Sequence, residues 1–243
     1  MQLRFLGSGD AFGSGGRFNT CFHVTGPRSS FLIDCGATAM VAMRRFAVDP
    51  NTIRTVFLSH LHGDHFGGLP FLLLDARFVS KRQVPLTIVG PPSTAERLDA
   101  AMEVFFPGSA SAPRPFGLRV IELAPGETRA IDEVTVRAFE VVHPSGAPSL
   151  SLRLEAEGKT IAYSGDTEWT EVLIEAGRSA DLFVCEAYAY DAPVKNHMDY
   201  RTLERKLGAL GAKQIVLTHP SAAMLGRTDL RYPLAQDGMV VEF

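Results

Sequence analysis

The segment at residues 57–68, FLSHLHGDHFGG, concentrates side chains that bind metal ions. His60, His62, Asp64 and His65 fall within six positions, directly after an apolar run. In an extended backbone, residues two apart project to the same side, so His60 and His62 are expected to chelate one ion together. Gly63 lets the chain turn at little cost, so Asp64 and His65 are expected to serve a second ion. These four ligands begin two sites and complete neither.

Three further candidate ligands lie where apolar strands end. His143 follows the run EVTVRAFEVV, Asp166 ends KTIAYSGD, and His219 ends KQIVLTH. Polar residues at the ends of strands mark the places where loops begin and where binding sites are commonly built. We therefore expect all three side chains to meet the histidine cluster.

Seven protein ligands are enough for two metal ions about 3.5–4 Å apart. Asp166 is the expected bridge, because a carboxylate has two oxygens and a neutral imidazole offers one free lone pair. Histidine-rich ligation favours two Zn²⁺ ions, and the carboxylates leave Mn²⁺ or Fe²⁺ as alternatives. Such a pair would activate a bridging hydroxide as nucleophile. The six other ligands divide into a first set of His60, His62 and His143 and a second set of Asp64, His65 and His219.

Short β-branched and apolar runs separated by turns predict many short strands, with about five helices between them. Strand runs in each half of the chain, each with its own helices, indicate two packed sheets with helices outside, an α/β (α+β) architecture. The segment 107–117 is rich in Pro, Gly and Ser and is expected to be a loop. Ser93 and Glu96 have capping-box spacing at the start of one helix. The strands are expected near 2–7, 21–26, 30–36, 53–60, 84–92, 118–123, 133–142, 149–156, 159–166, 181–187 and 213–220, and the helices near 37–47, 67–81, 93–106, 167–177 and 199–210.

Composition narrows the class of protein. The chain of 243 residues is 46% hydrophobic and 21% charged, with a net charge of −3 and no dense basic cluster, which disfavours a dedicated nucleic-acid surface. Three cysteines without a CxxC pair favour a reduced, cytoplasmic setting over a disulfide framework. The first residues do not follow the pattern of a signal peptide, and no apolar run reaches the roughly 20 residues of a membrane helix. We expect no membrane association.

The motifs HLHGDH, SGDT and LTH, together with the isolated His143, resemble the metallo-β-lactamase superfamily over nearly the whole chain. The resemblance implies a four-layer αββα sandwich, formed by residues 1–243 as a single hydrolase domain, with the site at the sheet edges. The opening FLGSGDAFGSGGRFNT and the segment LIDCG are similar to one branch of this superfamily. That branch contains the tRNA 3′-end processing endonucleases (ribonuclease Z) and smaller phosphodiesterases, and its members are often homodimers.

The resemblance to that branch implies a further pair of residues outside the metal ligands. A Glu at a strand end and a His before a helix pair there, and FVCEA and KNHMDY supply Glu186 and His197. A cationic imidazole at this place stabilises charge on a phosphoryl oxygen or protonates a leaving oxygen. We predict catalytic roles for His197, poised by Glu186, and for Asp64, which can share a hydrogen bond with the nucleophile.

The chain also departs from parts of the family pattern. Between His143 and Asp166 there is room only for a strand, a short turn and a strand, and not for an RNA-binding arm. His219 is followed by PSAAML instead of the SRY-like ending of the nucleases. Asp166 stands where lactam-opening members have a Cys. These departures weigh against tRNA processing and against antibiotic hydrolysis.

The remaining site expectations are less specific. GSGDAFGSGG lacks the GK[ST] ending of a P-loop, so a Gly-rich turn bordering the metal edge is expected, with Arg17 or Asn19 as substrate contacts. Asp34, in IDCG, is expected either to orient a ligand histidine from behind or to cap a turn. Trp169 is expected in the core.

The sequence therefore favours a dinuclear metal-dependent phosphodiesterase acting on a small or cyclic phosphodiester. Its expected partner is a small-molecule ester in preference to nucleic acid, and a homodimer is expected from the resemblance. The alternatives are a tRNA 3′-end processing-type endoribonuclease, a thioester or lactone hydrolase, and a metal-binding domain without turnover.

Overall fold

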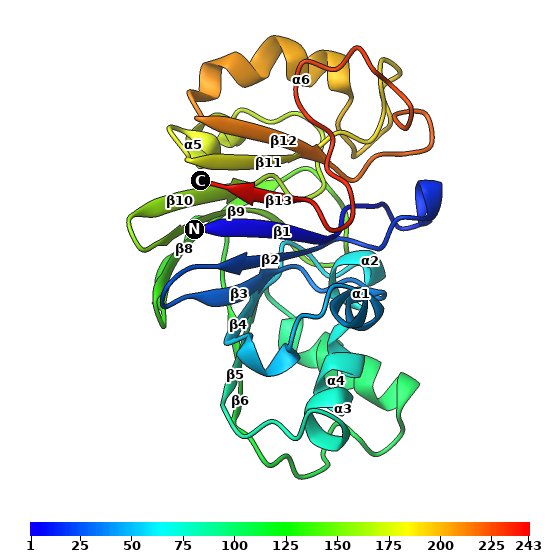
Figure 1. The fold of residues 1–243 in the computed structure, drawn as a ribbon, viewed down its shortest axis with the longest axis vertical. Helices are drawn as coiled ribbons and strands as arrows, with labels where there is room; N and C mark the ends of the chain where they lie inside the picture. The colour runs from blue at the N-terminus through cyan, green and yellow to red at the C-terminus, as the bar shows by residue number, and fades with distance from the viewer.

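Two β-sheets packed face to face form the centre of the computed structural model, which describes residues 1–243 (Figure 1). The first sheet mixes antiparallel pairs at β1, β2 and β3 with parallel pairs from β3 to β6. In the second sheet the pairs from β7 to β10 are antiparallel, and β10, β11 and β12 are parallel. In spatial order, the first sheet consists of β13 (Val240–Glu242), β1 (Gln2–Gly7), β2 (Cys21–Thr25), β3 (Ser30–Ile33), β4 (Thr55–Phe57), β5 (Leu86–Gly90) and β6 (Leu118–Glu122). The second consists of β12 (Gln214–Thr218), β11 (Leu182–Glu186), β10 (Lys159–Tyr163), β9 (Ser149–Ala156), β8 (Val134–Val141) and β7 (Thr128–Ile131).

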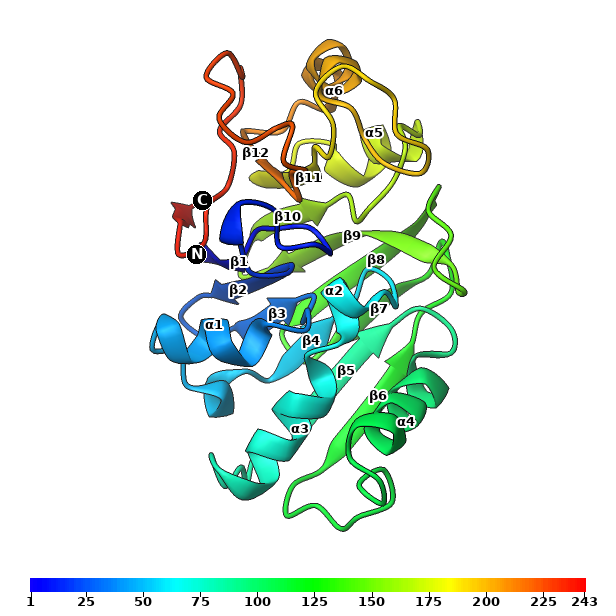
Figure 2. The same ribbon diagram turned by 90° about the vertical axis from the view of Figure 1, so that its right-hand side faces the viewer.

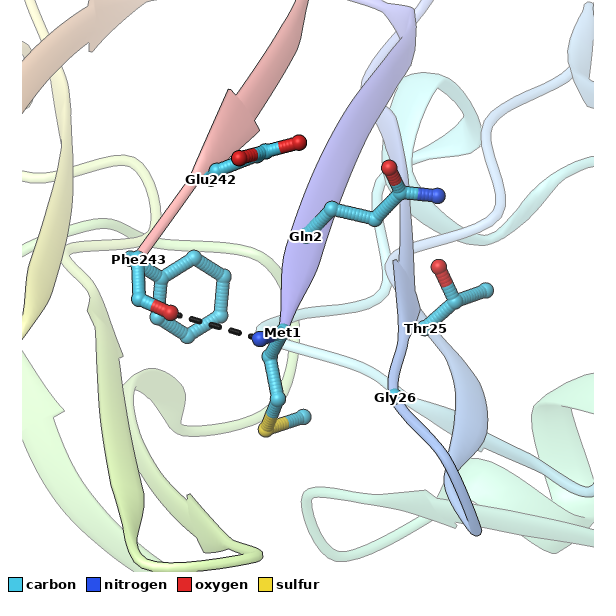
Figure 3. A pocket seen from close by; sticks show the side chains of 6 residues that line it. All are labelled: Met1, Gln2, Thr25, Gly26, Glu242 and Phe243. Atoms are coloured by element: carbon cyan, nitrogen blue, oxygen red, sulfur yellow. Dashed lines mark hydrogen bonds between the residues drawn. The ribbon is translucent and has the colours of Figure 1, made fainter.

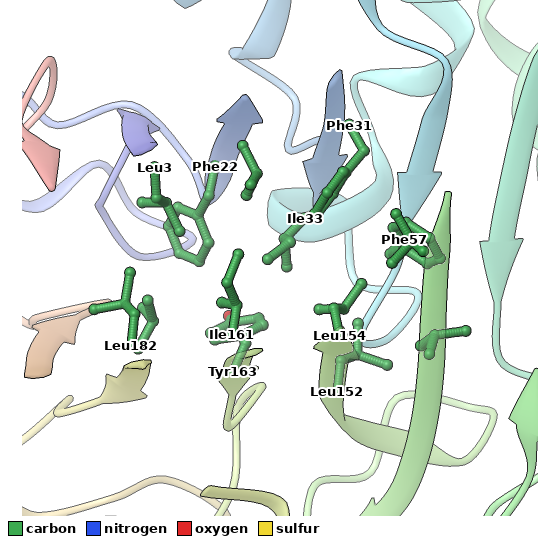
Figure 4. Close-up of a cluster of buried hydrophobic side chains, with 14 of the residues drawn as sticks. Leu3, Phe22, Phe31, Ile33, Phe57, Leu152, Leu154, Ile161, Tyr163 and Leu182 are labelled. Atoms are coloured by element: carbon green, nitrogen blue, oxygen red, sulfur yellow. The ribbon is translucent and has the colours of Figure 1, made fainter. Parts of the chain in front are cut away.

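The two sheets are joined by an apolar layer of buried side chains (Figure 4). Phe22 of β2 meets Tyr163 of β10 edge to face, with ring centroids 5.2 Å apart, so the contact spans the sandwich. Burying each such aromatic ring contributes roughly 1.5–3 kcal/mol. The layer therefore fixes the position of each sheet relative to the other, and with it the loops that both sheets carry.

Helices cover the outer faces of both sheets (Figures 1 and 2). The first sheet carries α1 (Ala39–Arg45), α3 (Leu69–Phe78) and α4 (Thr94–Phe105), which pack on a second apolar cluster. The other sheet carries α5 (Val172–Gly177) and α6 (Tyr200–Lys206) over a third cluster. The order helix, sheet, sheet, helix is the αββα sandwich that the sequence predicted, and this prediction is confirmed.

One edge of the sandwich collects the loops that carry the candidate ligands. Strands β10, β11 and β12 run parallel, and β8 points the same way because it and β10 are both antiparallel to β9. The carboxyl ends of these strands therefore share one edge. The short helix α2 (Gly63–Phe66), which the sequence did not predict, follows β4 and holds part of the HLHGDH motif.

The two ends of the chain meet beside Gln2, where β1 begins. The loop toward the candidate ligands leaves from the other end of this strand, after Gly7. The amino group of Met1 donates to the carbonyl oxygen of Phe243 at 3.3 Å, beside a surface hollow that Thr25 and Gly26 also line (Figure 3). The antiparallel pairing of β1 with β13 brings these ends together. This hollow lies away from the loop after Gly7, which leads to the candidate site.

Several local predictions differ from the structure. Ser93 has φ 72° and forms no side-chain capping bond, so the predicted capping box is wrong. A left-handed backbone at this residue departs from the extended conformation that a capping side chain requires. The first helical residue, Thr94, instead hydrogen-bonds to the Pro91 carbonyl oxygen through its hydroxyl at 2.6 Å. Strands β7 and β13 were not predicted, and α5 begins at Val172, later than expected.

Other local predictions agree with the structure, except the one for Trp169. Residues 107–117 contain no helix or strand, as expected for a loop. All three cysteines are buried and unpaired. Trp169 packs only at the edge of the cluster beneath α5 and α6 and is half-buried, so it is not a core residue. None of the helices combines the length and the apolar character that crossing a membrane requires.

Candidate metal centre

His60, His62 and His143 form the first group of ligand atoms. His60 follows β4 through Leu58 and Ser59, His62 immediately precedes α2, and His143 follows β8. The side-chain nitrogens of the three lie within 4.8 Å of one another. His143 Nε2 lies 3.0 Å from His62 Nδ1, and His60 Nε2 is buried with no hydrogen-bond partner.

Hydrogen bonds to the Nδ1 atoms of His60 and His143 determine which ring nitrogen carries the hydrogen and which keeps a lone pair for a metal ion. The Asn196 carbonyl oxygen lies 2.9 Å from His143 Nδ1, so that nitrogen carries the hydrogen and Nε2 keeps a lone pair. Ser59 Oγ donates to Asp34 at 2.8 Å and therefore accepts from His60 Nδ1 at 3.0 Å. Lone pairs of His60 and His143 thus converge on one point. This arrangement suits a cation. Without one, His60 Nε2 has no hydrogen-bond partner and His143 Nε2 faces only His62 Nδ1.

Asp64, His65, Asp166 and His219 form the second group. His65 Nε2 lies 3.3 Å from Asp64 Oδ2, 3.4 Å from Asp166 Oδ2 and 3.4 Å from His219 Nε2. His219 Nε2 lies 3.2 Å from Asp64 Oδ2 and 3.3 Å from Asp166 Oδ2. Four ligands at Zn–N and Zn–O lengths around a tetrahedral ion lie about 3.3–3.4 Å from one another. The observed spacing therefore fits a metal ion of this size.

Asp166 lies between the two groups. Its Oδ2 contacts the second group and lies 4.0 Å from His60 Nε2 of the first. Its Oδ1 is buried without a hydrogen-bond partner. A buried carboxylate oxygen without a partner is costly unless a cation satisfies it. The position and the free oxygen of Asp166 both fit a ligand shared by two ions.

The buried carboxylates of the second group also favour positive charge close to them. Burial acts to lower the pKa of His65, but the carboxylates of Asp166 and Asp64 raise it well above the ordinary value. Burial acts to raise the pKa of Asp64 and Asp166, yet the histidines around them hold both far below the usual range. In the first group, burial and then the nearby His65 lower the pKa of His60. Neutral imidazoles in the first group and ionised carboxylates in the second are protonation states that bind metal, and an ion in the second group would replace the proton that the carboxylates hold on His65.

Asp34 lies directly beneath both groups and is fully buried. Its Oδ2 is 2.7 Å from His65 Nδ1 and 2.8 Å from Ser59 Oγ, and its Oδ1 accepts from the Ser59 backbone N–H at 2.7 Å. The residue has φ 57°, a conformation that Asp and Asn tolerate better than most residues. Asp34 therefore orients His65 directly and His60 through Ser59.

Glu186 and His197 meet at the side of the second group. Glu186 ends β11 and is fully buried, and its Oε2 accepts from the Thr167 backbone N–H at 2.7 Å. His197 Nδ1 hydrogen-bonds to Glu186 Oε1, and the imidazole stacks on Tyr188 with centroids 4.6 Å apart. Burial and then Asp166 raise the pKa of Glu186 well above its ordinary value. Tyr188 thus supports one face of the His197 ring and Glu186 holds its Nδ1. The remaining nitrogen, Nε2, is left for the cavity that His197 lines.

A cavity of about 350 Å³ opens over the two groups. Its volume is at the small end of the usual range for ligand pockets. No Lys or Arg lines it. The lining residues are Ala11, Phe12, His62, Gly63, Asp64, His143, Asp166, Tyr188, His197 and His219.

Arg17 and Asn19, predicted as substrate contacts, do not line this cavity. The Arg17 guanidinium donates to Ser8 Oγ at 2.8 Å and to the Ala235 carbonyl oxygen. The Asn19 amide is buried and donates to the Asp10 carbonyl oxygen at 2.9 Å. Both side chains are used in holding the Gly-rich loop, so the structure does not support their predicted role.

Sequence reasoning missed Ser59, the Asn196 carbonyl, Tyr188 and Phe12. Ser59 adjoins His60 in the motif, and its position beside a ligand was the one available signal. The Asn196 carbonyl and Tyr188 reach the site from the loop between β11 and α6, whose path the sequence does not specify. Phe12 stands in the Gly-rich segment, whose pattern is typical of phosphate binding and gives no signal for the role of an aromatic residue.

Comparison with known proteins places the chain among metal-dependent hydrolases. A family model described as anti-Pycsar protein Apyc1 matches residues 1–229. Ribonuclease Z from Mycobacterium bovis is 26% identical over 239 residues, which covers 90% of this chain and 85% of that protein.

Solved structures agree with this placement. Human tRNase Z, short form, superposes with a TM-score of 0.82 at 25% identity, covering 100% of this chain and 99% of that chain. The metallo-β-lactamase fold protein YhfI from Bacillus subtilis superposes with a TM-score of 0.80 at 20% identity, covering 99% of this chain and 98% of that chain. The predicted superfamily and its ribonuclease Z-like branch are confirmed.

Proposed function

The chain belongs to the family of the anti-Pycsar protein Apyc1, and we propose that this metal-dependent hydrolase is a phosphodiesterase acting on a small or cyclic phosphodiester. The observation that carries the proposal is the cavity of about 350 Å³, whose floor holds both ligand groups and whose walls include no Lys or Arg. A space of this size suits one small molecule better than a polymer. The metal groups and His197 are then the features that meet the phosphoryl group.

We infer two divalent ions, with Zn²⁺ favoured by the histidine-rich donors and Mn²⁺ or Fe²⁺ as alternatives. One ion would be held by His60, His62 and His143, the other by Asp64, His65 and His219, with Asp166 shared. Bound there, the ions supply an activated water at neutral pH and positive charge against a phosphoryl oxygen.

The chain's own residues orient the substrate and move the proton. His197 presents Nε2 to the cavity while Glu186 holds its Nδ1 and Tyr188 supports its ring. In this position a protonated His197 donates to the departing oxygen or to a non-bridging phosphoryl oxygen. Asp64 also lines the cavity, and its carboxylate is placed to accept a hydrogen bond from the attacking water.

Endoribonuclease activity on tRNA 3′ ends is the second candidate, favoured by the similarity to ribonuclease Z over 90% of the chain. Two observations weigh against it. Residues 157–158 form the only connection between β9 and β10, so no RNA-binding arm stands between His143 and Asp166. The cavity also offers no Lys or Arg side chain to an RNA backbone.

We further propose that residues 1–243 act as one hydrolase domain, because ligands from His60 to His219 build a single site.

The homodimer expected from the resemblance has a candidate surface on α1, α3 and α4. Phe71, Phe78 and Phe105 there are 40%, 55% and 51% exposed, and Val79 lies among them. Sedimentation at micromolar concentration tests it, with a monomer refuting the dimer.

Hydrolysis assays test the proposed function directly. Metal-loaded protein is expected to hydrolyse bis-p-nitrophenyl phosphate and a 3′,5′-cyclic nucleotide, and Asp64→Ala is expected to abolish both activities. Asp99→Ala, on the exposed face of α4, is the matched control and is expected to keep full activity. Cleavage of precursor tRNA without small-diester turnover would establish the second candidate. Turnover of thioesters or lactones alone would reject phosphodiester chemistry.

A further inference from the structure

Phe12 is an exposed aromatic side chain at the mouth of the candidate metal centre. The residue is 82% exposed, the largest exposure among the large hydrophobic residues of the chain, and it lines the same cavity as His62 and Asp64. Burying a Phe side chain is worth roughly 1.5–3 kcal/mol. A ligand that binds in the cavity and covers the Phe12 side chain would therefore gain part of this free energy.

The loop that carries Phe12 is held in place on both sides. Asp10 Oδ1 accepts from the backbone N–H groups of Phe12 at 3.2 Å and Ser14 at 2.9 Å, and its Oδ2 accepts from Ser14 Oγ at 2.7 Å. Asp237 accepts from the backbone N–H of Ser8 at 2.9 Å and of Phe18 at 2.8 Å, tying the loop to the segment before β13 (Figure 1). The exposed ring is thus presented by a hydrogen-bonded turn, which reduces the ordering needed on binding.

The residues that line the cavity fall into two chemical classes. Seven lining residues are histidines, carboxylates or Gly63, and the other three are Ala11, Phe12 and Tyr188. The histidines and carboxylates among these seven account for metal ions and a phosphoryl group. Ala11, Phe12 and Tyr188 offer no charge to a second anionic group, whereas rings of substrate stack on or pack against aromatic side chains.

We propose that Phe12 is a specificity-determining residue that packs against an aromatic ring carried by the substrate, with the phosphoryl group of the same molecule at the metal centre. The substrate class is thereby narrowed to phosphodiesters with an aromatic substituent. This inference rests on the proposed function for the identity of the reacting group. The contact between Phe12 and the ring can be measured without turnover.

Calorimetric binding of two phosphonates to the zinc-loaded protein tests the proposal. Phenylphosphonate and methylphosphonate carry the same anionic group and differ only in the ring. Wild-type protein is expected to bind phenylphosphonate on the order of tenfold more tightly. Phe12→Ala is expected to remove most of this preference while leaving methylphosphonate binding unchanged, and Phe12→Trp is expected to keep it.

Two controls separate the ring contact from indirect effects. Phe78→Ala removes an exposed ring on α3, away from the cavity, and is expected to leave the preference intact. Sedimentation of Phe12→Ala is expected to match the wild type, since a changed oligomeric state would show that Phe12 contacts a second copy of the chain and would overturn the proposal.

The outcomes distinguish this proposal from the proposed function. Equal weakening of both phosphonates in Phe12→Ala, no change in either, or no binding of either to the wild type would overturn the role of Phe12. A preference for the ring that depends on Phe12, in a protein that hydrolyses no phosphodiester, would support the aromatic contact and reject the phosphodiesterase.

Discussion

Replacing Asp34 with Asn changes one atom beneath the metal centre and is expected to change which histidine nitrogens can bind metal. Asn has nearly the same volume as Asp and tolerates the φ of 57° found here. Oδ2 of Asp34 accepts from both His65 Nδ1 at 2.7 Å and Ser59 Oγ at 2.8 Å. If the Asn oxygen keeps the bond from the Ser59 backbone N–H, its NH₂ group occupies the Oδ2 position and donates where the carboxylate accepted.

The consequence for His65 follows from the hydrogen positions. Facing a donor, His65 Nδ1 must give up its hydrogen and accept, so the hydrogen moves to Nε2, the atom that meets Asp64 and His219. A protonated nitrogen cannot bind a metal ion. Removing such a supporting contact typically lowers metal affinity by about 10- to 100-fold. We expect a loss of this size for at least one of the two zinc ions.

The assay is a zinc titration against a competing chelator. The His65 tautomer is read by long-range ¹⁵N–¹H NMR of the metal-free protein at a pH above the raised pKa of His65, where the ring is neutral. Asp181→Asn is the matched control, because Asp181 is also buried and also accepts a backbone N–H, that of Thr160, far from the site. It is expected to leave zinc affinity unchanged. Wild-type affinity for both zinc ions in Asp34→Asn, with the hydrogen on Nε2 of His65, would refute the reasoning.

Three further predictions address the proton donor, the pH dependence and the metal. His197→Ala is expected to lower kcat on bis-p-nitrophenyl phosphate by about 10²- to 10⁴-fold with zinc content unchanged; loss of zinc in this variant would instead make His197 a metal ligand. Burial and then Arg4 lower the pKa of His23 from 6.5 to about 4. Its neutral form therefore contributes stability that is fully present above pH 6.5 and is lost as the pH falls toward 4. Wild type is expected to lose up to about 3 kcal/mol more unfolding free energy than His23→Gln between pH 7.5 and pH 4, measured with urea; equal losses would contradict this. Chelation of the metal is expected to lower Tm, since free metal at 100 times its Kd stabilises the folded state by about 2.7 kcal/mol. A Tm unchanged by chelation and by re-addition of zinc would show that the cluster does not bind it.

The residues predicted as ligands lie together in the structure because their positions follow from local rules. His60 and His62 lie two residues apart, and Gly63 begins a turn of helix that directs Asp64 and His65 elsewhere. The end of a strand is also readable from the sequence. Parallel packing then brings His143 and His219, far apart in the chain, to the same edge of the sheet.

The rest of the site depends on tertiary positions that local patterns do not contain. The Asn196 carbonyl supports His143 from a loop whose path is determined by contacts of Tyr188 and His197. Arg17 was expected at the substrate because it lies in the Gly-rich segment predicted to border the metal edge, yet its guanidinium joins Ser8 to the chain near Ala235. Charge and position in the sequence do not reveal which partner a long side chain will reach.

The capping box at Ser93 failed for a related reason. The spacing to Glu96 was correct, but the turn after Pro91 places Ser93 at φ 72°, and its side chain forms no capping bond. The backbone conformation of the preceding turn took precedence over the motif. Spacing predicts a cap only when the residue can adopt the extended conformation.

The central claim, two metal ions bridged by Asp166 and acting on a phosphodiester, is tested most directly by one titration. Metal-free protein is titrated with Zn²⁺ while hydrolysis of bis-p-nitrophenyl phosphate is followed. The rate is expected to rise until two equivalents of metal per chain have been added and then to remain constant. A plateau at one equivalent, or no hydrolysis at any metal ratio, would contradict the claim.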